Sequence, residues 1–143
     1  MSNTLKTIGQ HSFSFNFALI SLTIPDSVTE IYPYCFYRCL NLEDLVLSNQ
    51  IKTISNYSFS HCGMLLGSLI IPDSVTKIES YAFYSCSNFT TLKLGSNVQI
   101  IGLNAFDNCS NLIDELVIPD SVKIIENQAF NRCNNIKSLK LGN

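Results

Sequence analysis

The chain has 143 residues, of which 46% are hydrophobic and 14% are charged. This length and apolar content suffice for one domain with a real core, although the charged fraction lies below the roughly 25% of average soluble domains. The formal net charge is −2, and the nine Lys and Arg residues are scattered. Because these residues form no basic stripe that could contact a phosphate backbone, we expect no nucleic-acid partner.

The first 22 residues contain no basic segment followed by a long apolar run, so the sequence predicts no export signal. No run approaches the roughly 20 apolar residues that span a bilayer, and we expect no membrane span. As it stands, the chain is expected to be cytoplasmic. A cell-surface location would follow if the chain were a piece of a longer protein or were exported by another route.

A repeat of 23 or 24 residues runs through the chain. It is anchored by one Phe per repeat, which follows a small residue and stands three residues before a Cys in five of six repeats. The Phe column comprises Phe13, Phe36, Phe59, Phe83, Phe106 and Phe130. A regular period of this length is the signature of a solenoid, in which each repeat forms one coil.

Each predicted coil has three parts in chain order: V-x-x-I, then A-F-x-x-C, then L-x-x-L-x-I-P. The first coil departs from the pattern, with Asn16 at the Cys position and additional Phe15 and Phe17, which is consistent with a partial cap. Coils three and five carry one extra residue between the two Leu columns. We expect a single domain over 1–143, with coils near 5–28, 28–51, 51–75, 75–98, 98–122 and 122–143.

A longer period is superimposed on the first. Coils one, three and five carry I-P-D-S-V at 24–28, 71–75 and 118–122, whereas coils two and four do not. This alternation predicts that the duplicated unit was a pair of coils.

In L-x-x-L-x-I, the last two apolar residues alternate with one outward residue, which is the period of a strand with one buried face. Stacked coils should therefore form a parallel sheet on one face. Pro25, Pro72 and Pro119 should end the strand because proline cannot donate to a sheet ladder. On the other side we expect short strands, or 3₁₀ or helical turns at A-F-x-x-C. The predicted fold class is a β-rich leucine-rich-repeat solenoid of six coils.

These motifs resemble the BspA-like leucine-rich repeat, the 23-residue, Treponema pallidum type, over residues 5–142. The resemblance implies a non-enzymatic scaffold that binds proteins, with a surface adhesion module as one form of that role. It does not identify the partner.

The six cysteines form no C-x-x-C pair, and five occupy one repeat column, so we interpret them as buried small hydrophobic residues. Asp26, Asp73 and Asp120 recur only in every second coil, too far apart to share one calcium ion, and are interpreted as turn residues. His11 and His61 fall in different columns. The sequence therefore predicts no metal, no cofactor and no catalytic residues.

Two exposed surfaces are candidates for partner binding. The first is the outward face of the predicted sheet, with Asp44, Val46, Ser68, Ile70, Thr91, Lys93, Glu115, Val117 and Lys140. Its apolar residues are either β-propensity filler or a recognition strip, and both interpretations remain open. The alternative is a convex face formed by Tyr34, Tyr57 and Tyr81, which align in successive coils and either bind a partner or shield the turns.

The last coil carries no polar cap in this sequence, which leaves its apolar columns and strand edge open. We expect this edge to be covered by a second copy of the chain or by further sequence. The alternative function is accordingly an intracellular structural or assembly component, packed through open solenoid ends in a larger complex.

Overall fold

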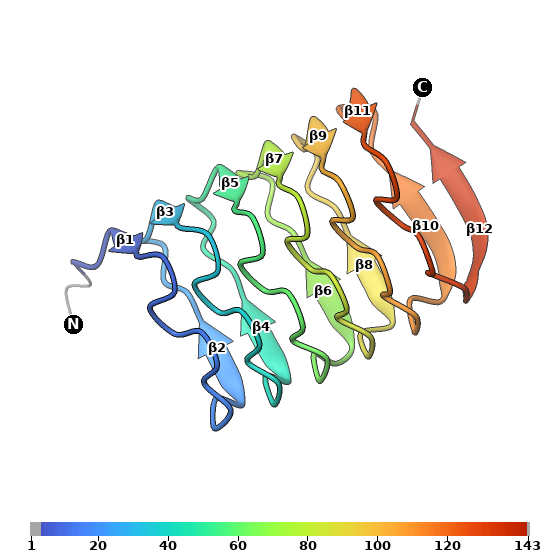
Figure 1. Ribbon diagram of the computed structural model, residues 1–143. Coiled ribbons are helices and arrows are strands. Elements are labelled where there is room, and N and C mark those ends of the chain that lie inside the picture. Colours follow the sequence, from blue (N-terminus) through green and yellow to red (C-terminus); the bar gives the residue numbers. More distant parts are fainter. Residues whose placement is uncertain (1–3, 143) are drawn as a thin grey trace.

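The computed structural model describes residues 4–142, except for the side chain of Asp114. The chain winds into a parallel β-solenoid of about six turns, which stack side by side from the N-terminus to the C-terminus (Figure 1). All strand pairs are parallel. The predicted repeat solenoid is thereby confirmed.

The strands form two walls. The wall built from L-x-x-L-x-I contains β2 (Ser21–Thr23), β4 (Asp44–Val46), β6 (Ser68–Ile70), β8 (Thr91–Lys93), β10 (Asp114–Ile118) and β12 (Ile136–Leu141). The wall built from V-x-x-I contains β1 (Thr7–Ile8), β3 (Glu30–Ile31), β5 (Thr53–Ile54), β7 (Lys77–Ile78), β9 (Ile100–Ile101) and β11 (Ile124–Ile125). The short strands predicted for the second wall are therefore present.

The first wall is divided into three strand pairs, β2–β4, β6–β8 and β10–β12. The breaks coincide with the extra residue of coils three and five. Gly67 accommodates this residue at a φ of +63° before β6. In the last pair the register shifts between Asp114 and Glu115, where β10 advances by one residue and β12 by two. A single inserted residue offsets the ladder locally, as in a β-bulge. The wall consequently follows the two-coil period of the sequence.

Aspartates bridge the same coil pairs. The Asp26 carboxylate accepts a hydrogen bond from the backbone N–H of Asn49 at 2.7 Å, and Asp73 accepts from the N–H and hydroxyl of Ser96 at 2.6 and 2.9 Å. These bonds hold the pKa of the Asp73 carboxyl below its ordinary value, because they stabilise the charged form. The aspartates are thus turn residues that also tie coil one to coil two and coil three to coil four.

No helical turn forms at A-F-x-x-C within residues 4–142; the segment is a run of β-turns instead. Its backbone N–H groups alternate between two kinds of acceptor. Phe36 and Arg38 donate to the next coil, whereas Tyr37 and Cys39 donate to carbonyls three residues back. Positive φ at two residues of each coil, such as Tyr34 and Arg38, prevents a continuous helix. The expectation of a helical or 3₁₀ turn was wrong for this reason.

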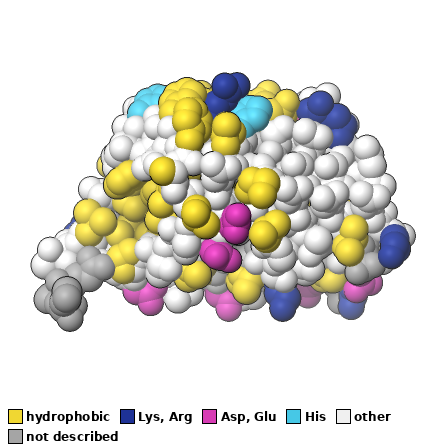
Figure 2. Space-filling model, turned by 90° about the horizontal axis from the view of Figure 1, so that it is seen from below, with side chains coloured by type: hydrophobic (Ala, Val, Ile, Leu, Met, Phe, Trp, Pro, Cys, Tyr) yellow, Lys and Arg dark blue, Asp and Glu magenta, His cyan; other side chains and the backbone are white. Residues whose placement is uncertain are grey.

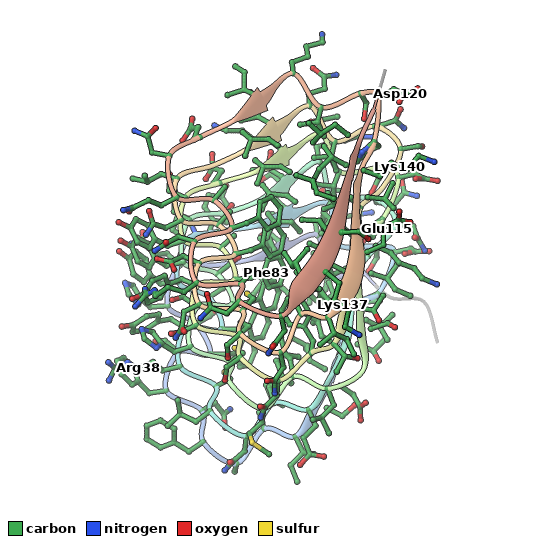
Figure 3. All side chains as sticks on the ribbon, turned by 90° about the vertical axis from the view of Figure 1, so that its right-hand side faces the viewer. Arg38, Phe83, Glu115, Asp120, Lys137 and Lys140 are labelled. Atoms are coloured by element: carbon green, nitrogen blue, oxygen red, sulfur yellow. The ribbon has the colours of Figure 1, made fainter. Side chains whose placement is uncertain are left out.

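The core contains a continuous column of stacked Phe rings, one from each coil. Phe83, a member of this column, lies inside the solenoid (Figure 3). The rings of Phe36, Phe59, Phe83 and Phe106 are fully buried. Beside them, the Cys86 thiol donates to the Phe59 carbonyl at 3.1 Å, and the same bond recurs for the other four cysteines of this column. Each coil therefore closes the core of its neighbour, as expected for a solenoid.

Candidate binding surfaces

The nine residues predicted for the sheet lie on the outward side of β4, β6, β8, β10 and β12; we call them the sheet face. Strand pairing places Ser68 opposite Thr91 and Ile70 opposite Lys93, and Glu115 and Val117 opposite Ser138 and Lys140. Glu115 and Lys140 project from the same side of the solenoid (Figure 3). The structure thus brings the predicted residues together on one surface.

Apolar side chains are exposed on the sheet face. Val46, Ile70 and Val117 keep 55%, 56% and 44% of their surface accessible, and the charged residues of the face, Asp44, Lys93, Glu115 and Lys140, are exposed as well. An apolar strip rimmed by charges of both signs is typical of protein-interaction sites.

The sequence analysis missed two further apolar residues of this region. Leu66 and Ile113, which stand shortly before β6 and β10, are 50% and 38% exposed. They occupy the position after the first Leu column in coils three and five, where coil four has Thr90. Comparing odd with even coils could have found them, because the two-coil period separates these positions.

The predicted tyrosine column forms a ladder of stacked rings. The ring centroids of Tyr34, Tyr57 and Tyr81 lie 4.6 Å apart at each step, with planes 5° apart. His11 extends the ladder at 4.8 Å from Tyr34. The three tyrosines are half-buried, and burial raises the pKa of Tyr57 above its ordinary value.

A second row of rings runs along the ladder, and its rings lie edge-on to the ladder rings. Tyr37 lies edge-on to Tyr34 at 5.5 Å and to Phe15 at 5.5 Å, and His61 contacts Tyr37 and Tyr84 at 5.8 and 5.3 Å. We call the two rows the aromatic surface: His11, Phe15, Tyr34, Tyr37, Tyr57, His61, Tyr81 and Tyr84. Arg38 lies beside it over the Tyr37 ring, and on the molecule it projects away from Glu115 and Lys140 (Figure 3).

Several residues of this surface hold an unfavourable backbone conformation. Tyr34, Tyr57, Tyr81, Phe15 and His61 have φ between +55° and +62°, where a side chain with a Cβ costs roughly 1–2 kcal/mol and Asn or Gly is preferred. Coil five has Asn at both equivalent positions, Asn104 and Asn108. The first four coils thus hold aromatic rings at positions where coil five has Asn.

The other side chains that could react or ionise are buried or take part in contacts within the fold. All six cysteines are buried and free, and burial raises the pKa of the Cys35 and Cys86 thiols to about 12. Asp107 is buried, but its carboxylate accepts hydrogen bonds from Nε and Nη2 of Arg132, both at 2.9 Å. Burial, and then Arg38, lower the pKa of His61. Among the residues described, no three His, Cys, Asp or Glu side chains could hold a metal ion.

A groove of about 610 Å³ lies beside β3 and β5. Glu30, Tyr32, Gln50 and Lys52 line it, and the Tyr32 hydroxyl donates to Glu30 at 3.1 Å. It contains none of the predicted site residues. Within residues 4–142 no helix is long and apolar enough to cross a membrane.

Comparisons with known proteins agree with this architecture. Among solved structures, a leucine-rich repeat protein of T. pallidum matches with a TM-score of 0.72 and 26% identity, over 96% of this chain and 56% of its own. A leucine-rich repeat protein of Bacteroides ovatus matches with a TM-score of 0.69 and 23% identity, over 97% of this chain and 43% of its own.

A leucine-rich cell surface protein of Faecalibacterium prausnitzii matches with a TM-score of 0.66 and 26% identity, over 99% of this chain and 31% of its own. The chain therefore spans between about a third and just over half of these structures. No curated protein matches it. The model of the BspA type leucine rich repeat region matches in six copies over residues 1–112 and 65–143. The chain belongs to the BspA-type leucine-rich repeat family.

Proposed function

We propose that the chain is a non-enzymatic protein-binding scaffold of BspA type, and that a protein partner docks on the sheet face. The observation that carries this proposal is the exposed apolar strip of Val46, Ile70 and Val117 on a rigid wall. A scaffold that holds such residues in fixed register binds without losing much conformational entropy. Leu66 and Ile113 enlarge the strip.

The size of the face sets how it is used. Five coil spacings of about 4.8 Å and a strand of about 13 Å give roughly 300 Å², compared with about 800 Å² per partner in a standard interface. A single array of this length therefore binds weakly, and useful affinity comes from a longer array or from repeated display. A cell-surface adhesion module is the form of this role that the F. prausnitzii cell surface neighbour supports.

A second candidate is an assembly component packed through the ends of the solenoid. It is favoured by apolar side chains exposed on the first and last coils, namely Phe13 at 47%, Leu139 at 58% and Leu141 at 61%. In this arrangement a second copy or further coils would cover the C-terminal coil. Light scattering over a wide concentration range tests it, since a strictly monomeric species at the highest concentration would contradict it.

Impermeant labelling of intact source cells separates the two candidates. Labelling of the protein supports adhesion, whereas labelling confined to lysed cells supports the assembly role. Capture experiments with Ile70→Asp, described in the Discussion, test the sheet face itself.

A further inference from the structure

The aromatic surface lies away from the sheet face and is not used by the function proposed above. It is built from five of the six tyrosines of the chain, together with both histidines and Phe15. In the view from below, both histidines and several Lys or Arg side chains border hydrophobic ones along one rim, where no acidic side chain is visible (Figure 2).

The ladder hides ring faces and presents ring edges. Because Tyr34, Tyr57 and Tyr81 stack 4.6 Å apart with planes 5° from parallel, the faces of Tyr57 are covered on both sides. A sugar or a nucleobase that binds by stacking needs an open ring face. The ladder offers instead a row of three phenol hydroxyls. The hydroxyls of Tyr34, Tyr57 and Tyr81 form no hydrogen bond with another described residue.

The spacing of this row matches one kind of chain. Two steps of 4.6 Å place the rings of Tyr34 and Tyr81 about 9.2 Å apart along the ladder. A polyproline II helix has three residues per turn and a rise of about 3.1 Å, so its carbonyls face one side every ~9.3 Å, and they have no internal partner. An extended strand repeats every ~6.7 Å and does not fit.

Area and charge favour the same occupant. Four coils by two rows of rings cover roughly 150 Å², a small part of the ~800 Å² that a folded partner or a second copy would need, but suitable for a short segment. Arg132 is neutralised by Asp107, whereas Arg38 is exposed and makes no ion pair with another described residue. The surface therefore carries one available positive charge at its edge.

We infer that the aromatic surface binds a short proline-rich segment in the polyproline II conformation, with an acidic residue of the segment beside Arg38. The hydroxyls of Tyr34 and Tyr81 donate to backbone carbonyls one turn apart. The Tyr57 hydroxyl lies at half a turn, where the nearest carbonyl points away from the surface. Docking of rigid proline-rich chains on aromatic surfaces is a general mode of recognition.

The test uses the full chain and a fluorescein-labelled decaproline, with fluorescence anisotropy as the measure of binding. The chain has no Trp, so its own emission comes from tyrosine and reports on this surface when unlabelled decaproline is added. We expect saturable binding with a Kd of about 1 mM or tighter. A Gly-Ser peptide of equal length should not bind.

Three variants test the register. Tyr34→Phe and Tyr81→Phe keep the stacked rings and should each weaken decaproline binding about five-fold, the cost of one hydrogen bond, while the matched Tyr57→Phe should change it less than two-fold. A decaproline extended by two Glu should bind more tightly than decaproline, and Arg38→Gln should abolish that gain.

Four results would overturn the inference: no change in tyrosine emission or anisotropy with decaproline; equal loss in all three Tyr→Phe variants; no loss in Tyr34→Phe or Tyr81→Phe; or binding of a chitin or cellulose oligosaccharide in preference to decaproline. Ile70→Asp should leave decaproline binding unchanged, so this inference and the proposed function fail separately.

Discussion

The ring of Phe83 lies 5.4 Å from that of Phe106, with the two planes 4° apart. On its other side Phe83 stacks on Phe59 at 5.3 Å. One Phe per coil thus stacks on its neighbours through the whole solenoid, so each interior ring contributes to two coil interfaces. The loss of one interior ring should weaken both.

Phe83→Ala should therefore lower the free energy of unfolding by about 3–5 kcal/mol, because a buried ring is replaced by a cavity. Phe13 occupies the same column but is 47% exposed and stacks on one ring only. Phe13→Ala should cost less than about 2 kcal/mol. Urea unfolding followed by circular dichroism measures both, and equal losses would contradict the stacking account.

Gly102→Ala should destabilise the chain by about 1–3 kcal/mol through overpacking. A Cβ at Gly102 would lie 2.8 Å from the backbone of Glu79 and Ser80 in the preceding coil, whereas at Gly63 the nearest atoms lie at 3.8 Å. Gly63→Ala serves as the matched control. If thermal unfolding shows that both variants are as stable as the wild type, the close approach between coils four and five is not the reason for glycine at position 102.

Gln128→Asn should stabilise the chain by up to about 1 kcal/mol, because Gln128 has a φ of +58° and Asn tolerates that region better. Gln128→Ala should give no such gain. Denaturant titration distinguishes the two, and an equal effect of Asn and Ala would mean that backbone strain does not limit stability at this turn.

The buried thiols should make the fold sensitive to alkali. Folding raises the pKa of Cys35 and Cys86 from an ordinary value near 9 to about 12. Their contribution to stability is complete below the unfolded pKa, and it is lost as the pH rises toward 12, because only the unfolded chain gives up these protons. The free energy of unfolding should fall by up to about 1.4 kcal/mol per pH unit for each thiol.

Cys86→Ala tests this dependence, because it removes one of these thiols and leaves the tyrosines in place. Between pH 8 and pH 10 the variant should lose less unfolding free energy than the wild type. Parallel stability curves for the two proteins would show that thiol ionisation is not responsible.

The repeat itself could be predicted because it is carried by residue types with strong preferences. The Phe, Cys and Leu columns face the core, and alternation in L-x-x-L-x-I specifies a strand with one buried face. The two-coil period was visible as I-P-D-S-V, and the structure gives it a physical form: Asp26 and Asp73 bond to the following coil, and the first wall divides into strand pairs.

The turns could not be predicted from the same columns. Positive φ falls on Tyr34, Arg38 and Gln128, residue types that give no local signal for it. The conformation is imposed by backbone bonds between coils, such as Phe36 N–H to the Ser58 carbonyl at 2.9 Å. The alignment of Tyr34, Tyr57 and Tyr81 was predicted, but the second row of rings edge-on to them, which depends on those turns, was not.

A comparison of partner capture by the wild type and by Ile70→Asp tests the central claim most directly. Ile70 is 56% exposed at the middle of the sheet face, and Leu40, 45% exposed in a turn, provides a matched control. Three immobilised proteins, the wild type, Ile70→Asp and Leu40→Asp, would be incubated with proteins of the source cell and of its surroundings. The captured proteins would then be quantified by mass spectrometry. The wild type and Leu40→Asp should retain the same partner, and Ile70→Asp should lose about ten-fold or more of it while staying folded. Equal capture by Ile70→Asp and the wild type would contradict a binding role for the sheet face.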